Sequence, residues 1–116
     1  MRVAGIGFRQ AATLASLYGA LARLGQPDAL ATAIAKAKAA VILDLAHQLG
    51  LPLLAVDVAG IATATRSPRV VLMHGTGSVA EAAALAALAP GASLIFPRVT
   101  SQDGMATAAM AEGDPI

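Results

Sequence analysis

The chain has 116 residues, which is enough for one domain with a single hydrophobic core. Hydrophobic residues make up 57% and charged residues 13%, the net charge is +1, and there is no cysteine. These values exclude disulfides and thiolate chemistry. The balanced charge and the absence of Trp argue against a nucleic-acid partner.

No segment is typical of membrane insertion or export. The longest charge-free run, residues 82–97, is interrupted by Pro90 and Gly91, so we expect no transmembrane helix and no membrane partner. The first residues lack the basic and apolar layout of a signal peptide. We therefore expect a cytoplasmic protein.

The first half of the chain alternates between strand and helix patterns. Residues 3–8 predict a buried strand that runs into a glycine turn, and residues 10–24 carry Leu and Tyr at helical spacing up to Gly25. Residues 30–34 predict a second strand. Residues 37–49 predict a second helix, because one side is apolar and Gly50 follows as a stop signal.

The second half continues the alternation with more irregular segments. We expect a strand at 53–56, a short helix from Asp57 to Ile61, a polar loop at 63–69, and at 70–73 either a strand or one helical turn. A helix is expected from 79 to about 89. Strands at 93–96 and 105–111 flank the turn signal Asp103-Gly104, which predicts an antiparallel hairpin.

Taken together, the elements predict the α/β class. We expect residues 1–116 to form one domain, a three-layer α/β/α sandwich with a mixed, mostly parallel sheet and an antiparallel C-terminal hairpin. Residues 112–116 are expected to form a frayed tail. In such folds ligands bind outside the carboxyl ends of the strands, where loops meet helix N-termini.

The most informative segment is residues 74–85, in which a glycine turn leads into an Ala-rich helix. Ser78 and Glu81 fit the capping-box pattern, with each side chain bonding to the other residue's backbone N–H. The glycines Gly75 and Gly77, with Thr76 between them, allow close approach to the helix N-terminus. That end of a helix attracts anions.

Several known site patterns are absent. The glycines at 5 and 7 are followed by Gln10 where a dinucleotide-binding loop needs a third glycine, and no Gly-Lys-Ser/Thr occurs. Only two histidines are present; His47 lies mid-helix, while His74 precedes the glycine turn and is the better functional candidate. Neither histidines nor carboxylates cluster at ligand spacing, so we expect no metal site and no cofactor.

Cationic side chains follow the first two predicted strands. Arg9 follows the first and Lys36 follows the second, so in a parallel sheet both lie at one edge. Arg98 and Lys38 are further candidates, although Lys38 reads more simply as a solvated surface cation. These residues predict a polyanionic small ligand.

Five motifs occur in an order that resembles the cobalamin-biosynthesis CobE family and the C-terminal domain of the CbiG hydrolases. They are Gly5-Ile-Gly-Phe-Arg9, residues 30–36, residues 45–53, residues 75–85 and residues 107–111. The resemblance implies a compact α/β domain that acts in corrin-ring synthesis. It also implies a precorrin-type tetrapyrrole as ligand, because a precorrin is a macrocycle with acetate and propionate carboxylates.

The resemblance, together with the glycine turn, gives the set of candidate site residues. The expected ligand-binding residues are Gly5, Gly7, Phe8, Arg9, Lys36, Gly75, Thr76, Gly77, Ser78, Val79 and Thr107. Glu81 and His74 are the candidate catalytic residues, as a general base. In the CbiG hydrolases the reaction opens a lactone on a cobalt-precorrin and releases a two-carbon aldehyde.

Four functions stay open at this point, of which the fourth and weakest is a generic phosphate-binding α/β domain. The first is a protein that binds a precorrin intermediate, as a catalyst or as a carrier. The second is a lactone-opening hydrolase. Two observations argue against this function: Ala39 stands where the family often has an acidic residue, and the hydrolases' N-terminal domain is not in this sequence. The third is a non-catalytic module whose Ala-rich helices contact another cobalamin-pathway enzyme.

Overall fold

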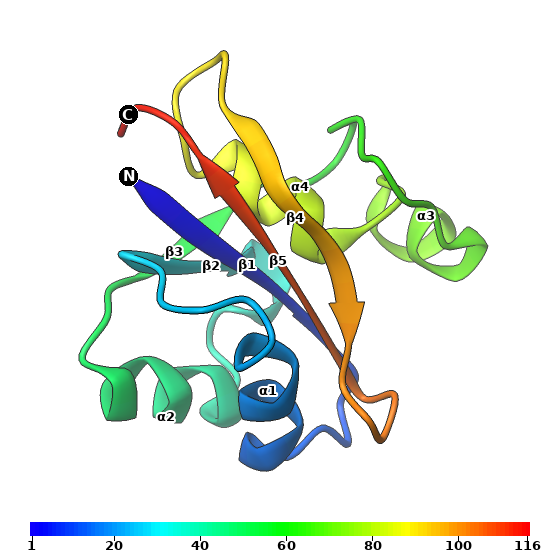
Figure 1. The fold of residues 1–116 in the computed structure, drawn as a ribbon. Coiled ribbons are helices and arrows are strands. Elements are labelled where there is room, and N and C mark those ends of the chain that lie inside the picture. The colour runs from blue at the N-terminus through cyan, green and yellow to red at the C-terminus, as the bar shows by residue number, and fades with distance from the viewer.

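The computed structural model describes residues 1–116 as one sheet with helices on both sides (Figure 1). The elements in chain order are β1 (Arg2–Phe8), α1 (Leu14–Leu21), β2 (Ala29–Ala33), the 3₁₀ turn η1 (Ile34–Lys36), α2 (Ala40–Leu49), β3 (Leu53–Val56), α3 (Pro68–His74), α4 (Val79–Ala86), β4 (Ser93–Thr100) and β5 (Ala106–Glu112).

The sheet has the strand order β3-β2-β1-β5-β4. Strands β1, β2 and β3 are parallel, whereas β5 is antiparallel to both β1 and β4. Only β5 therefore runs against the others. The mixed sheet and the antiparallel C-terminal hairpin confirm the predicted α/β class.

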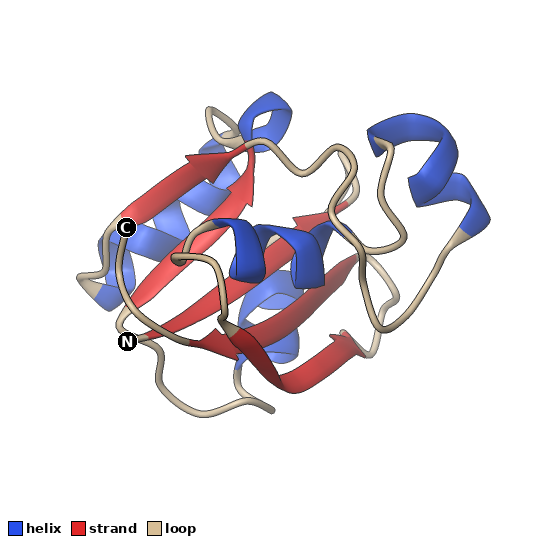
Figure 2. Cartoon of the chain, turned by 90° about the horizontal axis from the view of Figure 1, so that it is seen from above, coloured by secondary structure: helices blue, strands red, loops and turns tan.

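Two apolar layers flank the sheet, as Figures 1 and 2 show. Helices α1 and α2 cover one face, where Leu17 and Ile42 meet Met110 in one buried cluster. Helix α4 covers the other face with small side chains. At Gly5 a Cβ atom would overlap the carbonyl oxygen of Ala80, so this glycine allows α4 to lie directly on β1.

The first two helices are shorter than the sequence pattern predicts. Helix α1 begins only at Leu14, because Thr13 and Ser16 form a capping box there: Thr13 Oγ1 accepts the N–H of Ser16, and Ser16 Oγ accepts the N–H of Thr13. Helix α2 begins at Ala40, after η1, and ends at Gly50 with φ of 66°. The stop at Gly50 is thus the predicted one.

Two local predictions are resolved or corrected. The predicted short helix from Asp57 to Ile61 is wrong: Asp57 Oδ1 accepts the N–H of Ala59 at 3.1 Å, which closes a turn instead of starting a helix. The ambiguous segment 70–73 is helical. It belongs to α3, where Ser67 is the N-cap and Pro68 occupies the first turn.

The C-terminal hairpin is longer than predicted. Strand β4 extends to Thr100 and contains Pro97, which an edge strand tolerates because its outer N–H groups need no partner. After β5 the N–H of Gly113 donates to the oxygen of Met1 and the N–H of Ala89 donates to the oxygen of Asp114. These contacts hold much of the segment that we expected to be frayed. No helix combines the length and hydropathy needed to cross a membrane.

Candidate functional site

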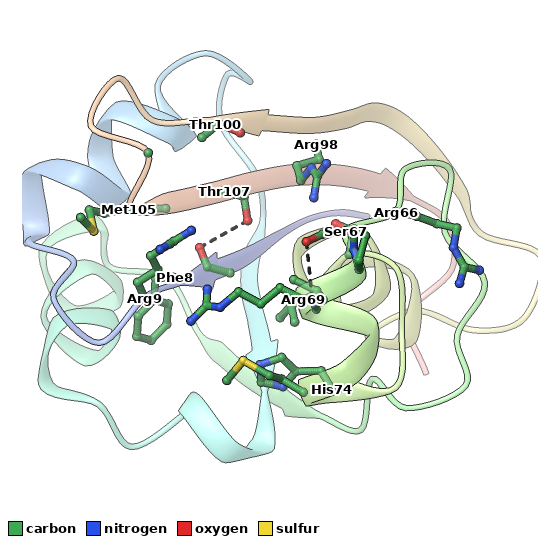
Figure 3. A pocket seen from close by; sticks show the side chains of 18 residues that line it. Phe8, Arg9, Arg66, Ser67, Arg69, His74, Arg98, Thr100, Met105 and Thr107 are labelled. Atoms are coloured by element: carbon green, nitrogen blue, oxygen red, sulfur yellow. Dashed lines mark hydrogen bonds between the residues drawn. The ribbon is translucent and has the colours of Figure 1, made fainter.

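A cleft of about 450 Å³ opens at the carboxyl end of β1 (Figure 3). One wall is formed by Gly7, Phe8 and Arg9 at the end of β1, and another by α3 and the start of α4. The β4–β5 hairpin completes it with residues on both strands. This is the edge at which parallel α/β folds bind ligands, because loops and helix N-termini meet there.

Cationic side chains line this cleft without acidic ones. Four of the eight basic residues contribute, Arg9, Arg66, Arg69 and Arg98, and no Asp or Glu does. None of their guanidinium groups makes an ion pair or a side-chain hydrogen bond; the molecule's ion pair joins Arg2 to Glu112, and its arginine side-chain hydrogen bond comes from Arg23. Figure 3 shows Arg9, Arg69 and Arg98 around the opening, whereas Arg66 extends away from them.

Lys36 adds a fifth cation beside the cleft. Its Nζ lies 5.2 Å from the centroid of the Phe8 ring, and Phe8 lines the cleft. The contact is a cation–π interaction. The parallel pairing of β1 with β2 brings Arg9 and Lys36 to one edge of the sheet. The sequence predicted this convergence.

His74 lines the same cleft at the end of α3. Burial, and then the positive charges of Lys36 and Arg69, lower the pKa of His74 below its ordinary 6.5. The imidazole is therefore neutral at neutral pH. A neutral imidazole can accept a proton or a hydrogen bond from a ligand, which fits the candidate role of His74 as a base.

The glycine turn before α4 faces two ways. Ser78 and Val79 line the cleft, as does Thr107 on β5. In contrast, Gly75, Thr76 and Gly77 line a separate hollow of about 190 Å³ behind α3. Thr76 Oγ1 donates to the oxygen of Ile61, and a Cβ at Gly77 would meet Thr63 and the Arg66 side chain. Residues 75–77 of the turn thus pack against the 61–66 loop and do not line the cleft.

Glu81 is not part of the cleft lining and does not complete the predicted capping box. Ser78 Oγ accepts the N–H of Glu81 at 3.3 Å, as predicted. The predicted return bond from the Ser78 N–H to the Glu81 side chain is wrong. The Glu81 carboxylate accepts instead the backbone N–H groups of Thr65 and Arg98, each at 2.8 Å. Glu81 is fully buried, and its two oxygens are used by segments far away in the sequence.

Two site residues in this region escaped the sequence analysis. Arg66 and Arg69 both fall in the segment expected to be a plain polar loop; Arg69 lies in the first turn of α3 and Arg66 just before that helix, and both line the cleft. The usable signal was the pair of cations around Ser67-Pro68, which is also a helix start. Gly5 lies outside the cleft, beneath α4, so its place in the motif reflects close packing.

Fold and site together define a compact α/β sheet domain with one cation-lined cleft at the carboxyl edge of its parallel strands. A family model described as Cobalamin synthesis G C-terminus matches residues 2–111, so the chain belongs to this family of cobalamin-biosynthesis proteins. No match was found among curated protein sequences.

Two solved structures are similar over nearly the whole chain. CobE, a protein from the cobalamin biosynthetic pathway, is 29% identical with a TM-score of 0.76, covering 96% of this chain and 89% of CobE. The cobalamin biosynthesis protein chiG from Agrobacterium tumefaciens is 32% identical with a TM-score of 0.72, covering 97% of this chain and 98% of chiG. The resemblance inferred from the motifs is thereby confirmed.

Proposed function

We propose that this protein binds a precorrin-type tetrapyrrole carboxylate in the cleft at the end of β1. The observation that carries the proposal is the set of unpaired cations at one opening: Arg9, Arg69 and Arg98 on the lining, with Lys36 beside it. Guanidinium groups bind carboxylates in two-bond geometry, and Lys adds a point charge. A ligand with several carboxylates on its rim can engage all of these groups together.

The rest of the lining fits the body of such a ligand. Val70, Met73, Val79 and Met105 add apolar surface to the lining that carries the cations. A macrocycle has apolar faces and an anionic rim, so it matches a cleft whose lining combines apolar and cationic side chains. The family membership and both similar structures support cobalamin biosynthesis as the setting.

A lactone-opening reaction is the second candidate function, and His74 is the observation that favours it. Its neutral imidazole lies on the cleft lining, where it can take a proton from an attacking water. Glu81 is a weaker candidate for this role, since both carboxylate oxygens are occupied by backbone N–H groups in the interior.

A non-catalytic interaction module receives less support. The Ala side chains of α4, which were expected to form a partner surface, are fully buried against the sheet at positions 80, 82, 83 and 84. They are therefore unavailable to another enzyme of the pathway. Any such partner would have to use a different surface.

The experiment is a titration of the wild-type protein with uroporphyrin, a tetrapyrrole whose rim carries acetate and propionate groups, followed by absorbance. A porphyrin with cationic substituents is the matched control. Saturable binding of uroporphyrin that weakens with added salt, with no binding of the cationic porphyrin, supports the proposal. Equal binding of both, or of neither at low salt, contradicts it. Aldehyde release from a lactone-bearing precorrin would add the hydrolase function.

A further inference from the structure

The carboxylate of Glu81 lies in an unusual position for an acidic side chain. It is fully buried, it has no cationic partner, and its hydrogen-bond donors are two backbone N–H groups. Burying a carboxylate is costly unless its hydrogen bonds are satisfied. Its place in the first turn of α4 offsets part of that cost, because the positive end of the helix dipole is there.

The two donors come from opposite sides of the cleft. Thr65 immediately precedes the segment 66–74, which includes α3 and carries Arg69 and His74. Arg98 belongs to β4 and itself lines the cleft. One side chain thus connects the α3 side of the cleft with the β4 side.

Each side is held only in part by other contacts: the loop before α3 bonds to the glycine turn, and β4 pairs with β5 along one edge. Helix α3 has no buried residue, and Leu72 on it is 87% exposed. Strand β4 is an edge strand whose register with β5 shifts between Phe96 and Val99, so Arg98 lies in an irregular stretch after Pro97. The shift frees the Arg98 N–H from the regular ladder, and Glu81 receives it.

A carboxylate suits this connection better than an amide does. Each of its oxygens accepts one of the two N–H groups at 2.8 Å. A Gln side chain of the same size has one acceptor oxygen, and its NH₂ group would face the second donor. Only an acidic residue of this length serves both segments at once.

We propose that Glu81 is a positioning residue for the cleft: its buried carboxylate fixes the separation between the α3 segment and β4, so that Arg69 and Arg98 engage one anionic ligand together. The effect of Glu81 on ligand binding rests on the proposed function. The connection itself is independent of any ligand. Glu81 touches no ligand in this account, and it acts through the two segments that it joins.

The first measurement needs no ligand. Amide hydrogen exchange is compared in wild type, Glu81→Gln and the core control Ile42→Val, which lowers stability from the opposite face of the sheet. We expect faster exchange at Thr65 or Arg98, and along α3, in Glu81→Gln but not in Ile42→Val at matched stability. Unchanged protection of both amides in Glu81→Gln would overturn the proposal, whether or not uroporphyrin binds.

The second measurement is a double-mutant cycle on uroporphyrin binding at low salt, using Glu81→Gln, Arg98→Ala and the combined variant. Each single change should weaken binding about fivefold: Arg98→Ala removes one solvent-accessible charge contact, which contributes modestly, and Glu81→Gln displaces the residue that makes it. If Glu81 acts through Arg98, the combined variant should bind about as well as Glu81→Gln alone. The positioning role would be overturned if the losses of binding in the two single variants added fully in the combined variant while Glu81→Gln also lost amide protection. That result would show a general structural role for Glu81. A wild type that does not bind uroporphyrin refutes the proposed function, and the exchange measurement still decides the connection.

Discussion

At the scale of single residues, cations of the cleft determine what it can bind. Arg9 is exposed, and Lys36 lies over the Phe8 ring, so each would make a solvent-accessible contact with the proposed anionic ligand. Such contacts are worth about 1 kcal/mol or less each, and more where water is excluded. Two of them therefore suffice for a measurable loss of affinity.

We predict that Arg9→Ala combined with Lys36→Ala weakens uroporphyrin binding by about tenfold or more, since about 1.4 kcal/mol is a factor of ten. The measurement is the same titration at low and high salt, where the difference should shrink as salt screens the charges. Lys38→Ala is the matched control, because Lys38 is exposed and does not line the cleft. Equal affinity of the double variant and wild type would contradict the cationic cleft.

His74 predicts a pH dependence of binding. Its pKa lies below 6.5 in the free protein because of burial, Lys36 and Arg69. An anionic ligand places negative charge nearby and raises that pKa, so binding takes up protons. Affinity for uroporphyrin should thus increase as pH falls from about 8 to about 6, where His74 becomes protonated in the complex.

The variant His74→Gln should bind with a flatter pH profile over the same range, since Gln does not titrate. Stability of the free protein provides a second check with a fixed sign. Because the folded state holds the His74 proton less tightly than the unfolded state, unfolding free energy should fall as pH drops through about 6.5. A wild-type profile identical to that of His74→Gln would exclude His74 from the site.

At the scale of elements, close contact between β1 and α4 depends on one glycine. A Cβ at Gly5 would overlap the Ala80 carbonyl oxygen and crowd the Ala84 nitrogen, and both are backbone atoms that cannot rotate away. Gly5→Ala should therefore destabilise the protein by about 1–3 kcal/mol or more, the usual cost of overfilling a core.

The matched control for Gly5→Ala is Gly19→Ala. Gly19 lies in α1, and no atom outside the helix's own backbone lies within 4 Å of an added Cβ there. Since Ala is the better helix former by about 1 kcal/mol, this change should stabilise the protein. Urea unfolding measures both variants, and the same sign for both would contradict the close β1–α4 packing.

A second prediction at this scale concerns the hairpin tip. Asp103 accepts hydrogen bonds from Ser101 and Ser16 side chains and from the Met105 N–H, which ties the hairpin to the capped start of α1. The Ser101 bond, then the Ser16 bond and the Met105 N–H, lower the pKa of Asp103 below 3.8. These bonds stabilise the fold above that pH, and their contribution is lost as pH falls through the lowered value.

Asp103→Asn should accordingly be less stable than wild type at neutral pH, with the difference shrinking as the solution is acidified below pH about 4. Urea unfolding at several pH values measures it. Asp28→Asn is the comparison variant. The Asp28 carboxylate lies far from Asp103 in the sequence and accepts the N–H of Arg2. If the stability difference between Asp103→Asn and wild type does not depend on pH, the ionised Asp103 carboxylate is not the form that these hydrogen bonds stabilise.

At the scale of the whole molecule, ligand binding should raise stability, because the cleft exists only when β1, α3 and the β4–β5 hairpin are assembled. At a free ligand concentration about one hundred times Kd, the expected gain is about 2.7 kcal/mol. For a chain of this size that is a rise in melting temperature of several degrees. Uroporphyrin that binds without raising the melting temperature would be binding outside the native cleft.

The sequence alone determined most of the local structure and the family. The apolar periodicity and the stop at Gly50 predicted the alternating elements, because these signals act between neighbours in the chain. The parallel alternation then implied that Arg9 and Lys36 share an edge. The motif order gave the cobalamin-biosynthesis family, which the family model confirms.

Tertiary structure decided which segments meet at the cleft. Arg69 joins Arg9 and Arg98 only because α3 and the β4–β5 hairpin line the same cleft, and no local pattern encodes that placement. Likewise Glu81 fits a capping box by spacing, but its carboxylate bonds to the N–H groups of Thr65 and Arg98, 16 and 17 residues away. A buried carboxylate takes whatever donors the assembled fold brings to it, and those donors are fixed by contacts between distant parts of the chain.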